Sequence, residues 1–228
     1  MDGKNLLRHF DTFIFDWDGT LRPMSALQRV NEAINPSWRH KKAVSTKYFD
    51  MYNGQAHQNT VKSRQTRLPG RVPKWPSEGE QLKGGMLKLV DISLFLSRPR
   101  LHYGAKETLK AIASSKKKIA LFTDGNLYRV GREMSRLGVE KYFGMVLSAQ
   151  SIKRLKPDPA GVEIILKKLG AQPSRTLYIG DRPDDIIAAK LAGTKSAAVT
   201  DGFSSMDVLI KYSPNYIFKN IEEFRKAL

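Results

Sequence analysis

Phe13-Ile14-Phe15-Asp16-Trp17-Asp18-Gly19-Thr20 joins a short apolar run to an acidic turn. Four further apolar runs of strand length follow along the chain. All five are continuous rather than alternating, as in parallel strands that are covered on both faces. The sequence therefore predicts strands at residues 12–15, 118–122, 145–149, 176–179 and 196–199.

Helical patterns separate the predicted strands. The spacing of apolar residues predicts helices over 105–114 and 127–137, the second ending at Gly138. A third helix has Asp158 as its N-cap and Pro159 at its first position, and it ends at Gly170. A fourth begins near Asp184 and closes at residue 193, and the tail adds an edge strand at 216–218 and a helix over 221–228. The order indicates an α/β fold.

Residues 22–101 interrupt this alternation. They contain helical spacing at both ends and, at residues 60–81, a basic stretch broken by proline and glycine. We expect residues 1–21 and 102–228 to form one catalytic core, and residues 22–101 to form a mostly helical cap with a basic loop at 60–81. Residues 22–100 hold 15 basic and 5 acidic residues, so most of the net charge of +17 lies in this insertion.

Composition narrows the classes of protein. The absence of cysteine excludes disulfides, thiolate metal sites and a cysteine nucleophile. No apolar run approaches the roughly 20 residues that cross a bilayer, and the first ten residues are too polar for a signal peptide. We therefore expect a cytoplasmic protein without a membrane partner. The positive charge favours anionic partners, and small phosphorylated substrates are favoured over nucleic acid.

The acidic turn after the first strand suggests phosphate chemistry on aspartate. Asp16 and Asp18 are separated by one residue, so both carboxylates are expected to face one small volume while Trp17 points elsewhere. Two such carboxylates require a cation, and Mg²⁺ prefers oxygen ligands and retains phosphate oxygens in its shell. Asp181, after the fourth strand, is the expected third acid.

A carboxylate can attack phosphorus and form an aspartyl phosphate, which divides one difficult displacement into two easier ones. Asp16 is the candidate nucleophile. Asp18 is the candidate proton donor to the leaving oxygen and later the base toward water.

Two later segments offer groups that bind a phosphoryl oxygen. Thr123 contributes a hydroxyl, and Asp124 and Gly125 contribute adjoining amides. Lys156, which Pro157 holds just ahead of a helix, contributes a positive charge.

Asp181 and Asp185 lie one helical turn apart at the expected start of a helix. We expect Asp181 to bind the metal and Asp185 to hold a metal water or to orient Lys156. Asp184 competes for the role of Asp185, because a shift of one residue in the helix start would exchange them.

Taken in order, these motifs resemble those of the haloacid dehalogenase superfamily of phosphohydrolases, and most closely its phosphoglycolate phosphatase and beta-phosphoglucomutase branch. The resemblance covers residues 6–22 and 103–228. It implies a Rossmann-like core, a helical cap at the insertion, Mg²⁺ dependence and the backbone carbonyl of Asp18 as a further metal ligand. The chain departs from relatives at Arg22-Pro23-Met24, where an acidic or small polar hinge is common, and at Thr123-Asp124, where Thr-Asn is commoner.

The predicted function is a Mg²⁺-dependent phosphatase of a small phosphorylated metabolite. A phosphosugar mutase would use the same residues and pass the phosphoryl group to a second hydroxyl instead of water. A protein that binds nucleic acid, or removes its phosphates, through the basic insertion is a further alternative. The oligomeric state and the substrate stay open.

Overall fold

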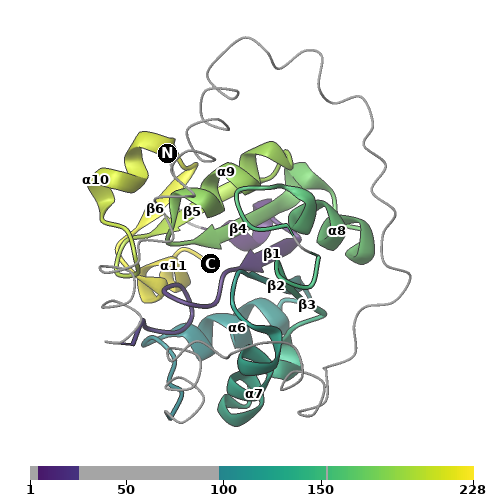
Figure 1. Cartoon of the computed structure of the whole chain (residues 1–228). Coiled ribbons are helices and arrows are strands. Elements are labelled where there is room, and N and C mark those ends of the chain that lie inside the picture. Colours follow the sequence, from purple (N-terminus) through teal and green to yellow (C-terminus); the bar gives the residue numbers. More distant parts are fainter. Residues whose placement is uncertain (1–4, 26–97, 153) are drawn as a thin grey trace.

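The computed structural model describes residues 5–25, 98–152 and 154–228, which build one parallel sheet (Figure 1). Its six strands lie in the order β3-β2-β1-β4-β5-β6, and all neighbours run parallel. The strands are β1 Thr12–Phe15, β2 Lys118–Thr123, β3 Met145–Ser148, β4 Thr176–Gly180, β5 Lys195–Val199 and β6 Tyr216–Phe218. The predicted α/β fold is confirmed, with each predicted strand within one residue of its expected bounds.

Helices connect the strands and cover both faces of the sheet (Figure 1). The longer ones are α6 Ala105–Ser114, α7 Leu127–Leu137, α8 Ala160–Leu169, α9 Pro183–Leu191 and α11 Ile221–Lys226. The shorter ones are α1 Leu6–His9 and α10 Met206–Leu209, with 3₁₀ turns η2 Glu140–Tyr142, η3 Pro173–Arg175 and η4 Ile210–Tyr212.

Local signals explain where these helices begin and end. The Asn126 side chain caps α7 by accepting from the backbone N–H of Arg129, and Gly138 ends that helix with φ 63°. The start of α8 was predicted one residue too early: Pro159 is the N-cap and Ala160 the first helical residue. Asp158 still caps this end, because its Oδ1 accepts from Ala160 N at 2.9 Å.

Alternate residues of β1 enter two separate cores. Phe13 and Phe15 pack on one face with apolar residues of α6, α7 and α11, whereas Ile14 packs on the other with residues of α8 and α9. All three side chains are fully buried. Burial on both faces is why this strand reads as an unbroken apolar run.

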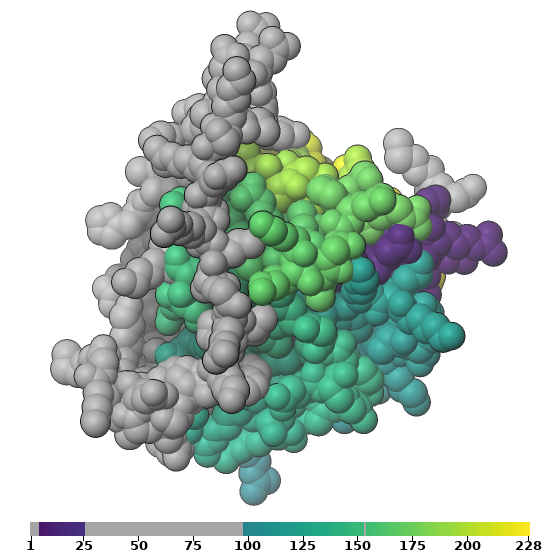
Figure 2. Space-filling view, turned by 90° about the vertical axis from the view of Figure 1, so that its right-hand side faces the viewer, coloured from purple at the N-terminus to yellow at the C-terminus, as the bar shows by residue number. Residues whose placement is uncertain are grey.

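The amino-terminal end of β1 is fixed by ion pairs on both sides. Asp11 binds Lys117, which precedes β2, and Arg175, which precedes β4. Figure 2 shows the N-terminal residues, in purple, between surfaces coloured teal and green. Because β1 lies between β2 and β4, its carboxyl end faces the point where strand order reverses, which is where open α/β sheets bind ligands.

Most of the helical cap predicted over residues 22–101, including its basic loop at 60–81, falls on residues 26–97 and so lies outside the described residues. The chain leaves and re-enters the core at adjacent positions, since His102 N donates to Leu21 O at 2.9 Å. Among the described helices, none has the length and apolar character to cross a membrane.

Candidate active site

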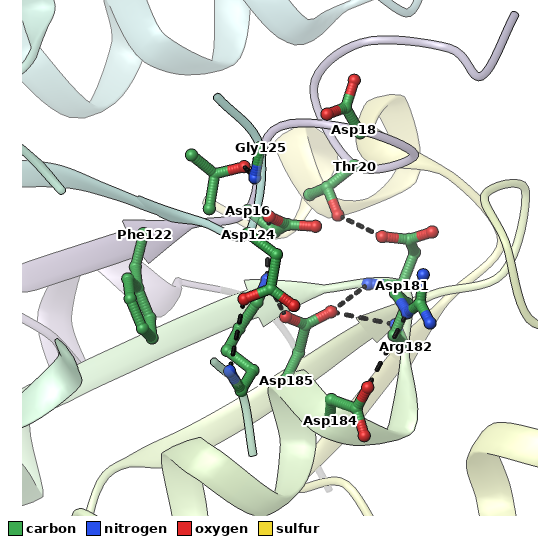
Figure 3. Close-up of polar contacts among 12 residues, drawn as sticks. Asp16, Asp18, Thr20, Phe122, Asp124, Gly125, Asp181, Arg182, Asp184 and Asp185 are labelled. Atoms are coloured by element: carbon green, nitrogen blue, oxygen red, sulfur yellow. Dashed lines mark hydrogen bonds and ion pairs between the residues drawn. The ribbon is translucent and has the colours of Figure 1, made fainter. Parts of the chain in front are cut away.

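Three carboxylates meet at the carboxyl edge of the sheet (Figure 3). Asp16 follows β1, Asp181 follows β4, and Asp185 lies in the first turn of α9. Each contributes one oxygen to a group whose members lie within 4.8 Å of one another. All three residues are buried, at 4%, 0% and 1% exposure. Side chains separated by up to 169 positions therefore form one acidic cluster, Asp16-Asp181-Asp185.

Lys156 lies against this acidic cluster. Lys156 comes from the loop between β3 and α8 and is only 2% exposed. The Nζ lies 2.9 Å from Asp16 Oδ1 and 2.7 Å from Asp185 Oδ1. A lysine that looks like ordinary surface in the sequence is thus a buried cation between two acids.

The electrostatics of the cluster suit a divalent cation. Burial raises the pKa of Asp16 well above its ordinary value, against the opposing charge of Lys156. Burial, together with repulsion from Asp185, raises the pKa of Asp181 to about 7. Burial alone would lower the pKa of Lys156, but Asp16 and Asp185 raise it well above its ordinary value. Three buried carboxylates and one ammonium leave an excess of negative charge, and their oxygens are the donors that hard cations prefer.

The structure distinguishes Asp185 from Asp184. Asp185 Oδ2 accepts from the backbone N–H groups of Asp181 and Arg182, at 3.1 and 3.0 Å, and its Oδ1 accepts from Lys156. Asp184 is outside the acidic cluster, and its Oδ2 lies 3.9 Å from Arg182 Nε. Asp185 thus joins Lys156 to the backbone of the loop that carries Asp181.

Asp181 is held tightly by its neighbours. Thr20 Oγ1 donates to its Oδ1 at 2.9 Å, and the backbone N–H of Phe203 donates to its Oδ2 at 2.6 Å. Glycines line the carboxylate on two sides: a Cβ added at Gly19 or Gly202 would lie 2.1 or 2.3 Å from Asp181 Oδ2. At both positions the backbone lies so close to the Asp181 carboxylate that glycine is required, and Gly19 also has φ 92°.

The candidate phosphate-binding turn follows β2. Thr123 is buried, and its Oγ1 accepts from Gly125 N at 3.0 Å. Asp124 Oδ1 accepts from Lys156 N at 3.2 Å, which ties this turn to the loop that carries Lys156. Ser148 Oγ donates to Gly125 O at 2.8 Å and fixes the turn from the β3 side.

The Asp18 carboxylate does not lie where we expected it, beside Asp16, and it is not part of the acidic cluster. Arg22 Nη1 and Arg129 Nη1 donate to its Oδ1, at 2.9 and 3.1 Å, and Arg129 Nη2 donates to its Oδ2. In Figure 3 the Asp18 carboxylate points away from the three clustered acids. The pull of two guanidinium groups explains why Asp16 and Asp18 do not share one volume.

Sequence reasoning missed Arg129, which binds Asp18, and Glu133, which binds Arg129. Arg129 and Glu133 are both buried in α7, where Arg129 Nη1 lies 3.0 Å from Glu133 Oε2. The Trp17 side chain points away from the Asp16-Asp181-Asp185 cluster, as predicted, and its Nε1–H donates to Glu133 Oε2 at 2.7 Å. The only sequence signal was the i,i+4 spacing of Arg129 and Glu133, which also describes an ordinary surface ion pair.

Tyr178 was also missed. It is a buried strand residue of β4 whose hydroxyl lies 3.1 Å from Phe122 O and 3.3 Å from Asp185 Oδ1. Within an apolar run it is indistinguishable from a core aromatic.

Several known proteins are similar to this chain in sequence or in fold. A phosphoglycolate phosphatase of Pseudomonas aeruginosa is 28% identical over 120 residues, which are 53% of this chain and 44% of that protein. The pyrophosphatase PpaX of Bacillus velezensis is 29% identical over 117 residues, 51% of this chain and 54% of that protein. The crystal structure of a predicted phosphoglycolate phosphatase from Haemophilus somnus 129PT superposes with a TM-score of 0.64 at 23% identity, over 96% of this chain and 97% of that one.

The chain thus spans about half the length of the curated relatives it matches. The model of the haloacid dehalogenase-like hydrolases matches residues 10–193, which include every residue of the acidic cluster together with Lys156 and the turn after β2. The chain belongs to the haloacid dehalogenase-like hydrolase family.

Proposed function

We propose that this protein is a Mg²⁺-dependent phosphatase that hydrolyses a small phosphorylated metabolite through an aspartyl-phosphate intermediate. The observation that carries the proposal is the convergence of Asp16, Asp181, Asp185 and Lys156 in one buried volume at the carboxyl edge of the sheet. Membership of a hydrolase family and the similarity to phosphoglycolate phosphatases support it.

In the first step, an Asp16 carboxylate oxygen attacks the substrate phosphorus, and the bond from phosphorus to the ester oxygen breaks. Asp18 donates a proton to the departing oxygen, so that an alcohol leaves. In the second step, Asp18 takes a proton from water as the water attacks phosphorus. The acyl phosphate bond then breaks, which releases inorganic phosphate and restores Asp16.

The remaining residues stabilise charge and fix positions. Lys156 and Thr123 hold the phosphoryl oxygens, and the amides of Asp124 and Gly125 supplement them. Asp16, Asp181, Asp185 and the backbone carbonyl of Asp18 are the groups that would hold Mg²⁺. When bound, the ion neutralises negative charge on the phosphoryl group. Asp185 also orients Lys156 through the contact at 2.7 Å.

The proposal is tested by a screen of phosphorylated metabolites with Mg²⁺, in which phosphoglycolate and pyrophosphate are included because the relatives' names point to them. We expect phosphate release from at least one compound. The Asp16→Asn variant should lose this activity by about 10³-fold or more, and chelation should abolish it. A folded protein that releases phosphate from no compound, or an unimpaired Asp16→Asn variant, would overturn the proposal.

The same preparation separates the two alternatives. A phosphosugar mutase would convert a sugar phosphate into its isomer with little phosphate release. The net charge of +17 motivates a nucleic-acid partner. Retention of single-stranded nucleic acid at physiological salt, undiminished in Asp16→Asn and accompanied by no phosphate release, would favour binding over catalysis.

A further inference from the structure

A buried group of charges surrounds Asp18, and we name its four members Asp18, Arg22, Arg129 and Glu133 the arginine cluster. Both oxygens of Asp18 accept guanidinium N–H groups: Oδ1 from Arg22 and Arg129, and Oδ2 from Arg129. Arginine pairs two parallel N–H groups with a carboxylate in a fixed geometry. Arg129, which binds both oxygens, therefore fixes the orientation of the Asp18 carboxylate together with Arg22.

Glu133 in turn fixes Arg129. Arg129 Nη1 lies 3.2 and 3.0 Å from the two Glu133 oxygens, and Glu133 Oε2 also accepts from Trp17 Nε1 at 2.7 Å. Arg22 Nε lies 3.3 Å from the same Oε2. Arg129 and Glu133 are 4% and 3% exposed, so water competes little for these bonds. Glu133 consequently holds the guanidinium of Arg129 in the position from which it binds Asp18.

Charge balance indicates what Arg129 does. Within the described residues, the four members of the arginine cluster are two cations and two anions, so their charges balance one another. Burial opposes the charge on Arg129, but Asp18 and Glu133 raise the pKa of Arg129 above its ordinary value. Arg129 is therefore a permanent cation that is directed to Asp18 and Glu133. Its guanidinium lies beside the candidate phosphate-binding turn, since a Cβ added at Gly125 would lie 2.5 Å from Arg129 Nη2.

We propose that Arg129 is a positioning residue that holds Asp18 in a resting position, turned away from Asp16, which Asp18 must leave in order to transfer a proton. The proposal rests on the proposed phosphatase function. In that function Asp18 gives a proton to the leaving ester oxygen and later takes a proton from the attacking water, both next to Asp16. Two positions of one side chain form a two-state equilibrium, and contacts made in only one state shift it toward that state. Hydrogen bonds from Arg129 to both Asp18 oxygens are such contacts.

If Arg129 holds Asp18 in this way, the effect of removing Arg129 on the rate of ester cleavage should depend on the leaving group. An alkyl phosphate needs a proton on its departing oxygen, whereas 4-nitrophenyl phosphate releases a stable anion and needs little help. Freeing Asp18 should therefore accelerate cleavage of the alkyl ester and leave the aryl ester nearly unchanged. A general loss of structure would lower both rates together. The ratio of kcat/KM for the two esters is the appropriate measure, because it covers the steps up to phosphoryl transfer.

The test uses the double variant Arg129→Gln, Glu133→Gln, which removes one positive and one negative charge and keeps a partner for Trp17. We expect the alkyl-to-aryl ratio to rise about threefold or more. Arg136→Gln, on the exposed side of the same helix, should leave the ratio unchanged. Asp18→Asn should lower it steeply. A ratio that stays constant or falls in the double variant overturns the proposal.

A crystal structure provides a second measurement that does not depend on turnover. In the wild-type protein with Mg²⁺ and orthovanadate, a mimic of the transferring phosphoryl group, we expect the Asp18 carboxylate to face Asp16 and to have left Arg129. Asp18 still paired with Arg129 in that complex would overturn the resting position even if the double variant did not fold. If the wild-type protein hydrolyses neither ester, the proposed function fails, and the position of Asp18 in this complex still decides the proposal.

Discussion

Lys156 Nζ lies 2.7 Å from Asp185 Oδ1, and this buried ion pair connects the loop after β3 to the first turn of α9. The same Nζ lies 2.9 Å from Asp16 Oδ1. Asp185 thus supports the lysine that contacts the candidate nucleophile, and its other oxygen binds the two amides of residues 181 and 182. Asp185 therefore positions Lys156 and the loop that carries Asp181 through these three contacts.

The first prediction separates two neighbouring acids. Asp185→Asn should lower kcat/KM on the order of 10²-fold, because an amide holds Lys156 and the residue-181 loop less firmly than a carboxylate. Asp184→Asn is the matched control: it is also buried but lies outside the acidic cluster, so its activity should stay within about threefold of wild type. Steady-state kinetics at saturating Mg²⁺ check both. Equal losses in the two variants would contradict this assignment.

Replacing the buried lysine should harm both activity and stability. Lys156→Met leaves Asp16 and Asp185 without their shared cation, which should cost about 3 kcal/mol or more of unfolding free energy and about 10²-fold in kcat. Urea unfolding and kinetics with the best substrate measure the two effects. Lys110→Met, at an exposed position of α6, should change neither. A stable, active Lys156→Met variant would show that this ammonium is dispensable.

The raised pKa of Asp181 predicts how the stability of the metal-free protein depends on pH. Its pKa is raised from 3.8 to about 7, so between these values the folded state binds more protons than the unfolded state. Stability should therefore fall as pH rises from about 4 to about 7, by a few kcal/mol for a fully buried carboxyl. Bound Mg²⁺ favours the ionised form and should reduce this fall.

Urea unfolding at pH 5 and pH 7.5, with a chelator or with Mg²⁺, measures this dependence. Asp181→Asn is the control, because it lacks this titrating group and should show a flatter pH profile and less stabilisation by Mg²⁺. The buried Asp16, whose pKa is also raised, contributes a fall of the same sign in both proteins. Identical profiles for the wild type and Asp181→Asn would argue against a raised pKa at this position. The raised pKa of Lys156 plays no part, since its contribution to stability is lost only at pH values above its ordinary 10.5.

The glycine beside Asp181 offers a test of close packing. In Gly202→Ala the new Cβ would lie 2.3 Å from Asp181 Oδ2, so the carboxylate or the loop that carries residue 203 must shift. We expect a loss of about 1–3 kcal/mol in stability and a weaker apparent affinity for Mg²⁺ in activity titrations. In Gly144→Ala the nearest atom lies at 3.6 Å, an ordinary contact, so that variant should behave like wild type. Unchanged Mg²⁺ affinity in Gly202→Ala would contradict the expected shift.

The sequence was a good guide where one physical signal dominates. Strands buried on both faces must be apolar throughout, so the Phe13-Ile14-Phe15 run predicted its own strand. The bounds of α7 agreed because Asn126 caps one end and Gly138 adopts the left-handed conformation at the other. Since parallel strands present their carboxyl ends at one edge, the order of motifs also placed Asp16 and Asp181 together.

Side-chain partners across the fold were harder to foresee. Whether Asp18 faces Asp16 or a pair of arginines depends on how α7 packs beside the loop after β1, and no spacing in the sequence encodes that distance. Arg129 and Glu133 looked like a solvated pair because the i,i+4 rule does not tell a buried face from an exposed one. The start of α8 shifted by one residue because an aspartate can cap from either of two adjacent positions.

The hydrogen bond between Leu21 and His102 has a consequence for how such a protein can diversify. Because the core fastens the two borders of the insertion to each other, the polypeptide between them can be lengthened, shortened or exchanged while the strand pairings on either side stay intact. Changes at residues 26–97 can therefore accumulate without moving the strands that carry the reacting groups, whereas Arg22, at the start of the interval, is tied to the site through its hydrogen bond to Asp18.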